Sequence, residues 1–189
     1  MTVKSFDKVI AKLEDKDLRR HSESALSFLR NYVLKNLRGS LKNALSSGNV
    51  VKNFTIGRMF TYVYDPMTKE KLPYWDTNPL ILFLKPNGYR NFYGINVHYL
   101  TPKQREMIFV HLANTLNNRR LDETTKMRIN YKSLLSVSDA VSDAVKQYSY
   151  SQLRSPIIEV EPKYWDVMLF LPYANFVKNE EYRKQHKEE

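Results

Sequence analysis

The spacing of apolar residues changes near residue 50, and that change limits the possible folds more than any other feature of the chain. Between residues 6 and 37 most apolar residues recur at steps of three and four, which is typical of helices. A polar linker containing glycine and serine follows at residues 39–49. Beyond it, aromatic and β-branched residues alternate as they do in strands. We therefore expect an N-terminal helical arm (residues 1–50), a core (residues 51–177) and a polar charged tail (residues 178–189).

The core sequence predicts an α+β fold. Its pattern indicates about five short antiparallel strands, at residues 58–64, 80–84, 92–99, 156–161 and 166–171. Thr101 and Pro102 predict the start of a helix over residues 102–116, and two short helices are expected within residues 118–154. Short strands protect their edges best by curling, so we expect a bent sheet or a small SH3-like barrel with flanking helices. A flat antiparallel sheet with helices on one face is the alternative.

Composition excludes several classes of protein. The 189 residues include no cysteine, which rules out disulfides, a thiolate nucleophile and cysteine-ligated metals. The chain has neither an apolar leader nor an apolar run long enough to span a bilayer, so we expect a soluble protein without a membrane partner. Thirty Lys and Arg residues against twenty Asp and Glu residues give a formal net charge of +10. Such a charge favours a polyanionic partner, either nucleic acid or an acidic protein.

The sequence contains none of the common catalytic motifs. Its five glycines form no phosphate loop or dinucleotide fingerprint, no serine lies in a nucleophile elbow, and its four histidines show no metal-ligand spacing. A Mg²⁺-dependent nuclease is the remaining enzymatic alternative, with ligands from Asp65, Glu70 and Asp76 or from Glu159 and Glu161. We expect a non-catalytic protein without a metal, a cofactor or a small-molecule substrate.

Basic side chains suggest binding to DNA phosphates, which needs no reading of the base sequence. The candidate contacts form two helical groups and one hairpin tip: Arg30, Lys35, Arg38 and Lys42; Arg119, Arg120, Lys126, Arg128 and Lys132; Tyr89 and Arg90. The alternative for each cation is that it only solvates a helix. Exposed aromatic residues of the core could stack on unpaired bases, although most are expected to fill the interior of the sheet.

Three segments between residues 57 and 100 carry a recognisable pattern: GRMFTYVYDP, KLPYWDTNPLILFL and FYGINVHYL. The WDVMLFLP segment at residues 165–172 fits the same pattern. On these segments the chain resembles a virion protein family of tailed, contractile-tail phages, the phage DNA end protector proteins. The residues of the pattern suggest a scaffold: Gly94 permits close backbone approach, and Asn96 and His98 can form hydrogen bonds with neighbouring loops.

The resemblance implies a role at the ends of DNA. A protein of this family is expected in the phage particle and then in the host cytoplasm, where it binds the ends of linear packaged double-stranded DNA and shields them from host exonuclease. Other virion proteins are expected as further partners. The alternative is a structural or assembly protein of the phage head, neck or baseplate, whose positive charge meets acidic proteins.

Overall fold

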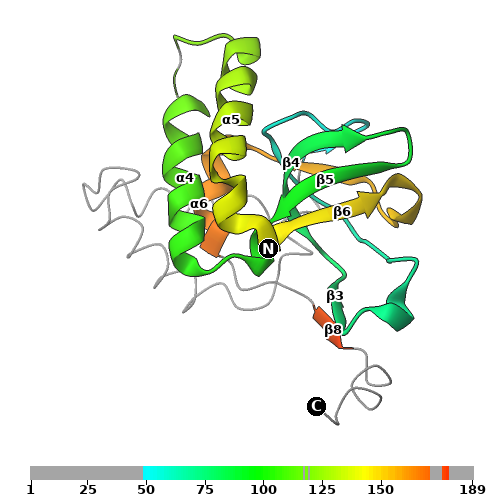
Figure 1. The fold of residues 1–189 in the computed structure, drawn as a ribbon. Coiled ribbons are helices and arrows are strands. Elements are labelled where there is room, and N and C mark those ends of the chain that lie inside the picture. Colours follow the sequence, from blue (N-terminus) through cyan, green and yellow to red (C-terminus); the bar gives the residue numbers. More distant parts are fainter. Residues whose placement is uncertain (1–48, 117, 119, 171–175, 179–189) are drawn as a thin grey trace.

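The computed structural model describes residues 49–116, 118, 120–170 and 176–178. In these ranges, helices cover one side of an antiparallel sheet (Figure 1). Almost all of the predicted helical arm and of the charged tail lies outside the described residues.

Six strands form the main sheet in the order β1-β7-β2-β4-β5-β6. They are β1 (Asn49–Val51), β2 (Met59–Thr61), β4 (Leu80–Asn87), β5 (Asn91–Asn96), β6 (Val145–Ser149) and β7 (Ile157–Val160). A separate two-stranded ribbon pairs β3 (Tyr74–Asp76) with β8 (Phe176–Lys178). The helices are α4 (Pro102–Leu116), α5 (Glu123–Ser138) and α6 (Trp165–Phe170). The short 3₁₀ helices are η1 (Lys69–Lys71), η2 (Val97–Tyr99), η3 (Asp139–Ala144), η4 (Tyr150–Gln152) and η5 (Pro162–Tyr164).

The central strands bury side chains on both faces of the sheet. Phe60, Ile81 and Phe83 belong to one cluster of buried side chains. Their chain neighbours Met59 and Leu82 point to the opposite face, because successive strand residues alternate, and they are equally inaccessible to solvent. Each face of the sheet is therefore covered by its own layer.

The sheet covers its first face by bending around an aromatic cluster. Phe54, in the loop between β1 and β2, has its ring centroid 5.0 Å from that of Phe60, 4.6 Å from that of Phe92 and 6.1 Å from that of Tyr150. Val51 of edge strand β1 packs against the same cluster as Tyr150, which directly follows edge strand β6. The two edges thus bend toward one another, and each favourable ring pair adds about 0.5–1.5 kcal/mol.

The helices cover the second face (Figure 1). They contribute side chains that are at most 1% exposed, namely Ile108, Leu112, Leu134, Trp165, Met168 and Leu169. Arg105 Nη1 donates to the carbonyl of Leu169 at 2.8 Å and so joins α4 to α6. Trp165 Nε1 donates to the carbonyl of Val160 at 2.8 Å, which fixes α6 against the end of β7.

The α+β class is confirmed, and so is the helix predicted over residues 102–116. Thr101 and Gln104 exchange the bonds of a capping box at its start: Thr101 N donates to Gln104 Oε1 at 2.9 Å, and Gln104 N donates to Thr101 Oγ1 at 3.3 Å. The expected barrel does not close, because no ladder joins β1 to β6 within the described residues. Those residues also hold eight strands rather than about five, since β1, β3 and β8 are three residues long and too short to show alternation.

Two predictions in the C-terminal half are wrong. The strand expected at residues 166–171 is helix α6, because Pro162 begins the preceding turn and Trp165, Met168 and Leu169 share one buried helical face. The second short helix expected within residues 118–154 is replaced by η3 and strand β6. The φ angle of −127° at Val141 interrupts helical geometry before β6 begins.

Gly94→Ala is expected to destabilise the protein by about 1–3 kcal/mol, because a new methyl group would overfill the space between β4 and β5. An added Cβ would lie 3.0 Å from Cδ1 and 3.1 Å from Cβ of Ile81, which is fully buried. Urea denaturation of the full chain measures the loss. Ile81→Val removes that Cδ1, so the double variant should lose less than the sum of the single losses, and strict additivity would contradict the packing argument.

Candidate functional site

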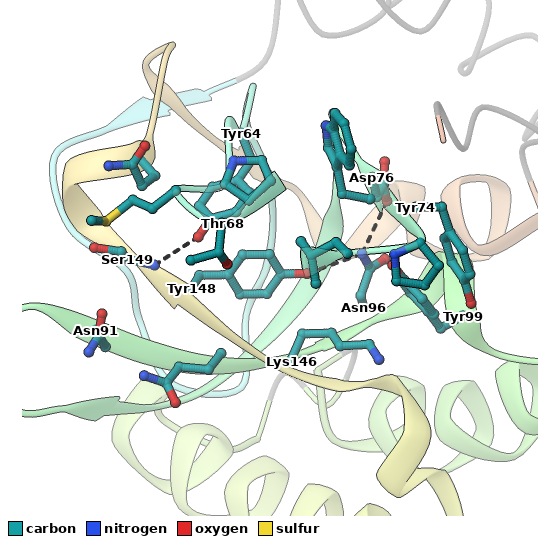
Figure 2. A pocket seen from close by; sticks show the side chains of 17 residues that line it. Tyr64, Thr68, Tyr74, Asp76, Asn91, Asn96, Tyr99, Lys146, Tyr148 and Ser149 are labelled. Carbon is teal, nitrogen blue, oxygen red and sulfur yellow. Dashed lines mark hydrogen bonds between the residues drawn. The ribbon is translucent and has the colours of Figure 1, made fainter. Parts of the chain in front are cut away.

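A pocket of about 440 Å³ opens between the main sheet and the β3–β8 ribbon. Five aromatic side chains line it: Tyr64, Tyr74, Trp75, Tyr99 and Tyr148. Figure 2 shows four of them, Tyr64, Tyr74, Tyr99 and Tyr148, around the cavity together with Lys146 of β6. The pocket lies on the aromatic-cluster face of the sheet, because Tyr148 belongs to that cluster and Lys146 lies two residues away on the same face of β6. The α4–α5 layer covers the other face.

The rings in the pocket are arranged in contact with one another and with a cation. The rings of Tyr74 and Tyr99 are stacked at 6.0 Å with an angle of 21° between them. Lys146 Nζ lies 4.3 Å from the ring centroid of Tyr99, within the range of a cation–π contact. Phe176 of β8 packs edge-on against both tyrosine rings at 5.6 and 5.2 Å, so β8 supports the aromatic wall from behind.

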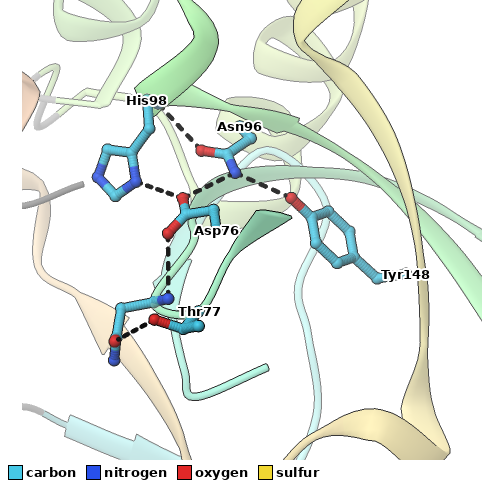
Figure 3. Close-up of polar contacts among 6 residues, drawn as sticks. Asp76, Thr77, Asn96, His98 and Tyr148 are labelled. Atoms are coloured by element: carbon cyan, nitrogen blue, oxygen red, sulfur yellow. Dashed lines mark hydrogen bonds and ion pairs between the residues drawn. The ribbon is translucent and has the colours of Figure 1, made fainter. Parts of the chain in front are cut away.

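A buried polar network lies at the floor of the pocket (Figure 3). Asn96 Nδ2 donates to Asp76 Oδ2 and to Tyr148 Oη, each at 3.1 Å. His98 Nδ1 lies 2.5 Å from the same Asp76 oxygen, and Asp76 Oδ1 accepts from the backbone N–H of Asn78 at 3.0 Å. Asp76, Asn96 and His98 are all buried. The network therefore connects β3, β5, η2 and β6 at one point.

Three exposed cations are neighbours, in sequence or in strand register, of residues that line the pocket. Arg90 precedes the lining residue Asn91, Lys71 precedes the lining residue Leu72, and Lys178 is the register partner of Tyr74. All three cations are exposed. The nearby carboxylate of Asp65 forms ion pairs with Lys69 and, at 3.8 Å, with Arg154. The resulting surface suits an anionic ligand that has flat apolar parts.

Burial raises the pKa of two phenols that line the pocket, Tyr148 and Tyr99. It raises the pKa of Tyr148 well above its usual value, and the nearby Asp76 charge raises it further. It also raises the pKa of Tyr99 to about 12, with smaller contributions from Tyr74 and Asp76. A neutral phenol adds no negative charge to the pocket, so these groups do not oppose an anionic ligand.

The predicted DNA contacts fall into separate groups. Five of them, Arg30, Lys35, Arg38, Lys42 and Arg119, lie outside the described residues. Tyr89 and Arg90 occupy the β4–β5 turn as expected, with Tyr89 fully exposed and Gly88 at a φ of 64°. This turn adjoins the pocket, because the carbonyl of Arg90 accepts from Tyr150 N at 2.9 Å and from Ser149 Oγ at 3.3 Å.

The remaining predicted cations lie on or beside α5, away from the pocket. Arg128 and Lys132 are exposed and share one helical face, Arg120 is exposed just before the helix, and Lys126 is half-buried. Because α5 covers the opposite face of the sheet, these cations and the pocket form two surfaces rather than one (Figure 1).

Lys146 and Tyr148 were missed as candidates from the sequence. They lie in a stretch whose apolar spacing allowed a helix despite its serines, and a helix would have placed them on different faces. A strand assignment for residues 145–149 would have put them on one face. Tyr74, Trp75 and Tyr99 are among the core aromatic residues considered for base stacking, but the sequence did not show that they meet at one cavity.

Three of the carboxylates proposed as metal ligands have other partners in the structure. Within the described residues, no three His, Asp or Glu side chains lie close enough to hold a metal ion. Asp76 is buried in the polar network, Asp65 is held by basic side chains, and Glu159 lies 3.9 Å from Arg58. In the same ranges, every helix is too short or too polar to reach across a membrane.

Asp76→Asn is expected to destabilise the protein by about 2–4 kcal/mol. An amide N–H at the position of Oδ2 would face the amide N–H of Asn96, and flipping the amide would instead lose the bond from Asn78. Urea denaturation measures the change. Asp65→Asn, at a half-exposed carboxylate, is the matched control and should cost much less. Equal losses in the two variants would show that the network does not stabilise the fold.

Stability is expected to fall as the pH rises through the range from about 10 to about 12. The unfolded chain loses its tyrosine protons near pH 10, whereas burial raises the pKa of folded Tyr99 to about 12 and the pKa of Tyr62 and Tyr148 well above 10. The folded state binds more protons than the unfolded state in this range, so the free energy of unfolding decreases as the pH rises. Below about pH 10 these tyrosines are protonated in both states, and their titration does not change the free energy of unfolding. Denaturation of wild type and Tyr99→Phe across this range tests the linkage. The variant should show a shallower decline, and identical slopes would refute the linkage.

The chain was compared with known families, curated proteins and solved structures. A family model described as "Phage T4 terminal DNA protecting protein" matches residues 7–187. No curated protein and no solved structure matches the chain. The match covers nearly the whole sequence and includes every residue of the pocket and of its polar floor. The chain therefore belongs to the phage family of terminal DNA protecting proteins.

Proposed function

We propose that this protein binds the ends of linear double-stranded DNA without cleaving them, and that it shields these ends from exonucleases. It would act in the phage particle and then in the host cytoplasm. The family description names the protection of terminal DNA. The structural observation that carries the proposal is the aromatic pocket, whose lining also includes the cation Lys146. A DNA end differs from the rest of a duplex in exposing base faces beside phosphates, and this surface suits both.

The charge distribution supports binding that does not depend on sequence. The whole chain carries +10, Arg90 and Lys71 are exposed next to residues of the pocket lining, and exposed Lys178 is the register partner of Tyr74. Cations of this kind replace the counterions of the phosphates, so affinity should fall steeply with salt. Aromatic rings stack on any base, which allows ends of different sequence to be bound.

The cations of α5 are part of the proposal as a second surface for phosphates. Arg128 and Lys132 lie one turn apart on an exposed helical face. They contact no part of the pocket, which opens on the other side of the sheet. They would therefore add affinity for any duplex without favouring an end.

Exonuclease digestion provides the direct test of end protection. A linear blunt duplex incubated with the wild-type protein is expected to resist an added double-strand exonuclease, with protection weakening as salt is raised. A nicked circle of the same sequence serves as the competitor, and it should relieve protection less effectively than an equal mass of linear fragments. Degradation at the rate of naked DNA would overturn the proposal.

Incubation with Mg²⁺ alone separates protection from cleavage. The wild-type protein should leave both linear and circular DNA intact in the absence of the exonuclease. Appearance of shortened or nicked DNA would favour the nuclease alternative.

Replacing both Arg128 and Lys132 by Gln should reduce the slope of log affinity against log salt by about 2, because two phosphate contacts are lost. The ratio of affinities for ends and circles should stay as in the wild type. Fluorescence anisotropy with labelled duplexes at several salt concentrations measures both quantities. An unchanged slope would show that α5 does not contact DNA.

An assembly role is the second candidate, and a feature of the same helix favours it. Ile129 and Leu135 are 36% and 44% exposed on α5, beside Lys132. Exposed apolar side chains mixed with cations are common where proteins meet. If the α5 variant keeps its DNA affinity but loses a stoichiometric complex with another virion protein, this surface serves assembly.

A further inference from the structure

The pocket lining includes large apolar side chains that stay exposed to solvent. Met67 and Tyr74 line it and are 70% and 46% exposed, whereas the core rings of Phe60 and Phe92 are inaccessible to solvent. Large apolar side chains gathered at one opening mark a place where a ligand excludes water. The stacked ring of Tyr99 holds Tyr74 in place, so the exposed part of Tyr74 forms a flat wall.

Polar groups are placed beside this wall in a way that suits a nucleotide. Lys146 lines the pocket, and its Nζ lies over the ring of Tyr99. The amide and hydroxyl side chains of Gln147, Ser149 and Gln152 line the same cavity. Aromatic rings offer stacking to a base, and an adjacent ammonium group offers an ion pair to its phosphate.

The size of the pocket decides what can enter. Its volume of about 440 Å³ lies in the range of roughly 300–1,000 Å³ that is typical of sites for small organic molecules. It can take one nucleotide but not the width of a duplex. A terminal base must therefore leave its partner before it enters, at a cost of a few kcal/mol that stacking on the aromatic wall would offset.

We propose that the pocket captures a single unpaired nucleotide at the end of a DNA strand, with its base against Tyr74 and its phosphate near Lys146. This inference rests on the proposed function and adds to it that the protein opens the last base pair. The buried network beneath the pocket keeps the floor fixed, since Asp76 and Asn96 bond to each other and to groups of the protein.

A fluorescent base tests the capture. Two otherwise identical blunt duplexes carry 2-aminopurine either at the last position of one strand or at the centre. Stacking on tyrosine rings should quench the terminal probe when the wild-type protein binds, and leave the central probe unchanged.

A duplex with a mismatched last pair should bind about tenfold more tightly than a matched one, because its base is already unpaired.

Variants of the pocket identify the residues responsible. Tyr74→Ala and Lys146→Gln should each lower the affinity for blunt ends about tenfold and remove the preference for the mismatched end. Tyr74→Phe keeps the ring and should restore both. Lys52→Gln neutralises an exposed lysine outside the pocket lining and serves as the control for loss of charge. Circular dichroism melting shows whether each variant is folded.

Trp75 gives a second readout that needs no modified DNA. The chain has two tryptophans, of which Trp75 lines the pocket and Trp165 is 1% exposed beneath the helices. A short single-stranded oligonucleotide should change the tryptophan fluorescence of the wild-type protein, and this change should be absent in Trp75→Phe. An equal change in both proteins would place the oligonucleotide outside the pocket and contradict the capture.

The outcomes separate the two proposals. If the wild-type protein protects linear DNA but does not quench the terminal probe, and Tyr74→Ala protects equally well, nucleotide capture is refuted and end protection stands. If the wild-type protein neither protects nor prefers ends, the proposed function itself is refuted. Quenching of the terminal and central probes alike would show binding along the duplex and would also refute capture.

Discussion

The carboxylate of Asp76 sits at the point where separate parts of the chain meet. It is buried between Asn96 and His98, and through Asn96 it is linked to the hydroxyl of Tyr148. A buried carboxylate is costly unless each of its oxygens accepts hydrogen bonds, and here both do. That requirement fixes the β3–β8 ribbon against the main sheet, and the pocket is the space left between them.

The aromatic cluster lies on the same face of the main sheet as the pocket and shields that face from water. In the part of the chain that the structure describes, helices cover only one face of the six-stranded sheet. The apolar side chains of the other face would be exposed to water unless another part of the chain covered them. Phe54 fills this role from a loop, and the bent sheet brings Val51 and Tyr150 to the same cluster from opposite edges. Tyr64 and Tyr148 contact each other at the end of this cluster and also line the pocket. The site is therefore continuous with the hydrophobic core.

The sequence indicated the elements whose signals are local. Thr101 and Pro102 mark the start of α4, and the apolar run of β4 followed by a Pro-Asn-Gly turn identifies the β4–β5 hairpin, with the exposed Tyr89 at its turn. Elements of three residues carry no period, and the apolar run of α6 is equally compatible with a strand. Their assignment depends on contacts with distant residues.

The site was harder to predict than the fold for the same reason. Asp76 and His98 were read as a possible metal ligand and a structural imidazole, and the structure makes them partners across 22 positions of sequence. Tyr148 joins the same network from 52 positions beyond Asn96. Periodicity along the chain describes which face a residue occupies, but it does not describe which faces meet.

The β3–β8 pairing also sets an order of events during synthesis. Residues 74–76 leave the ribosome long before residues 176–178, and Phe176 supplies the ring that supports both Tyr74 and Tyr99. The main sheet and its helices can form first, because all of their strands precede residue 161 and α6 ends at residue 170. The aromatic wall is therefore assembled after the main sheet, and a nascent chain gains its complete pocket only once residues 176–178 have been synthesised.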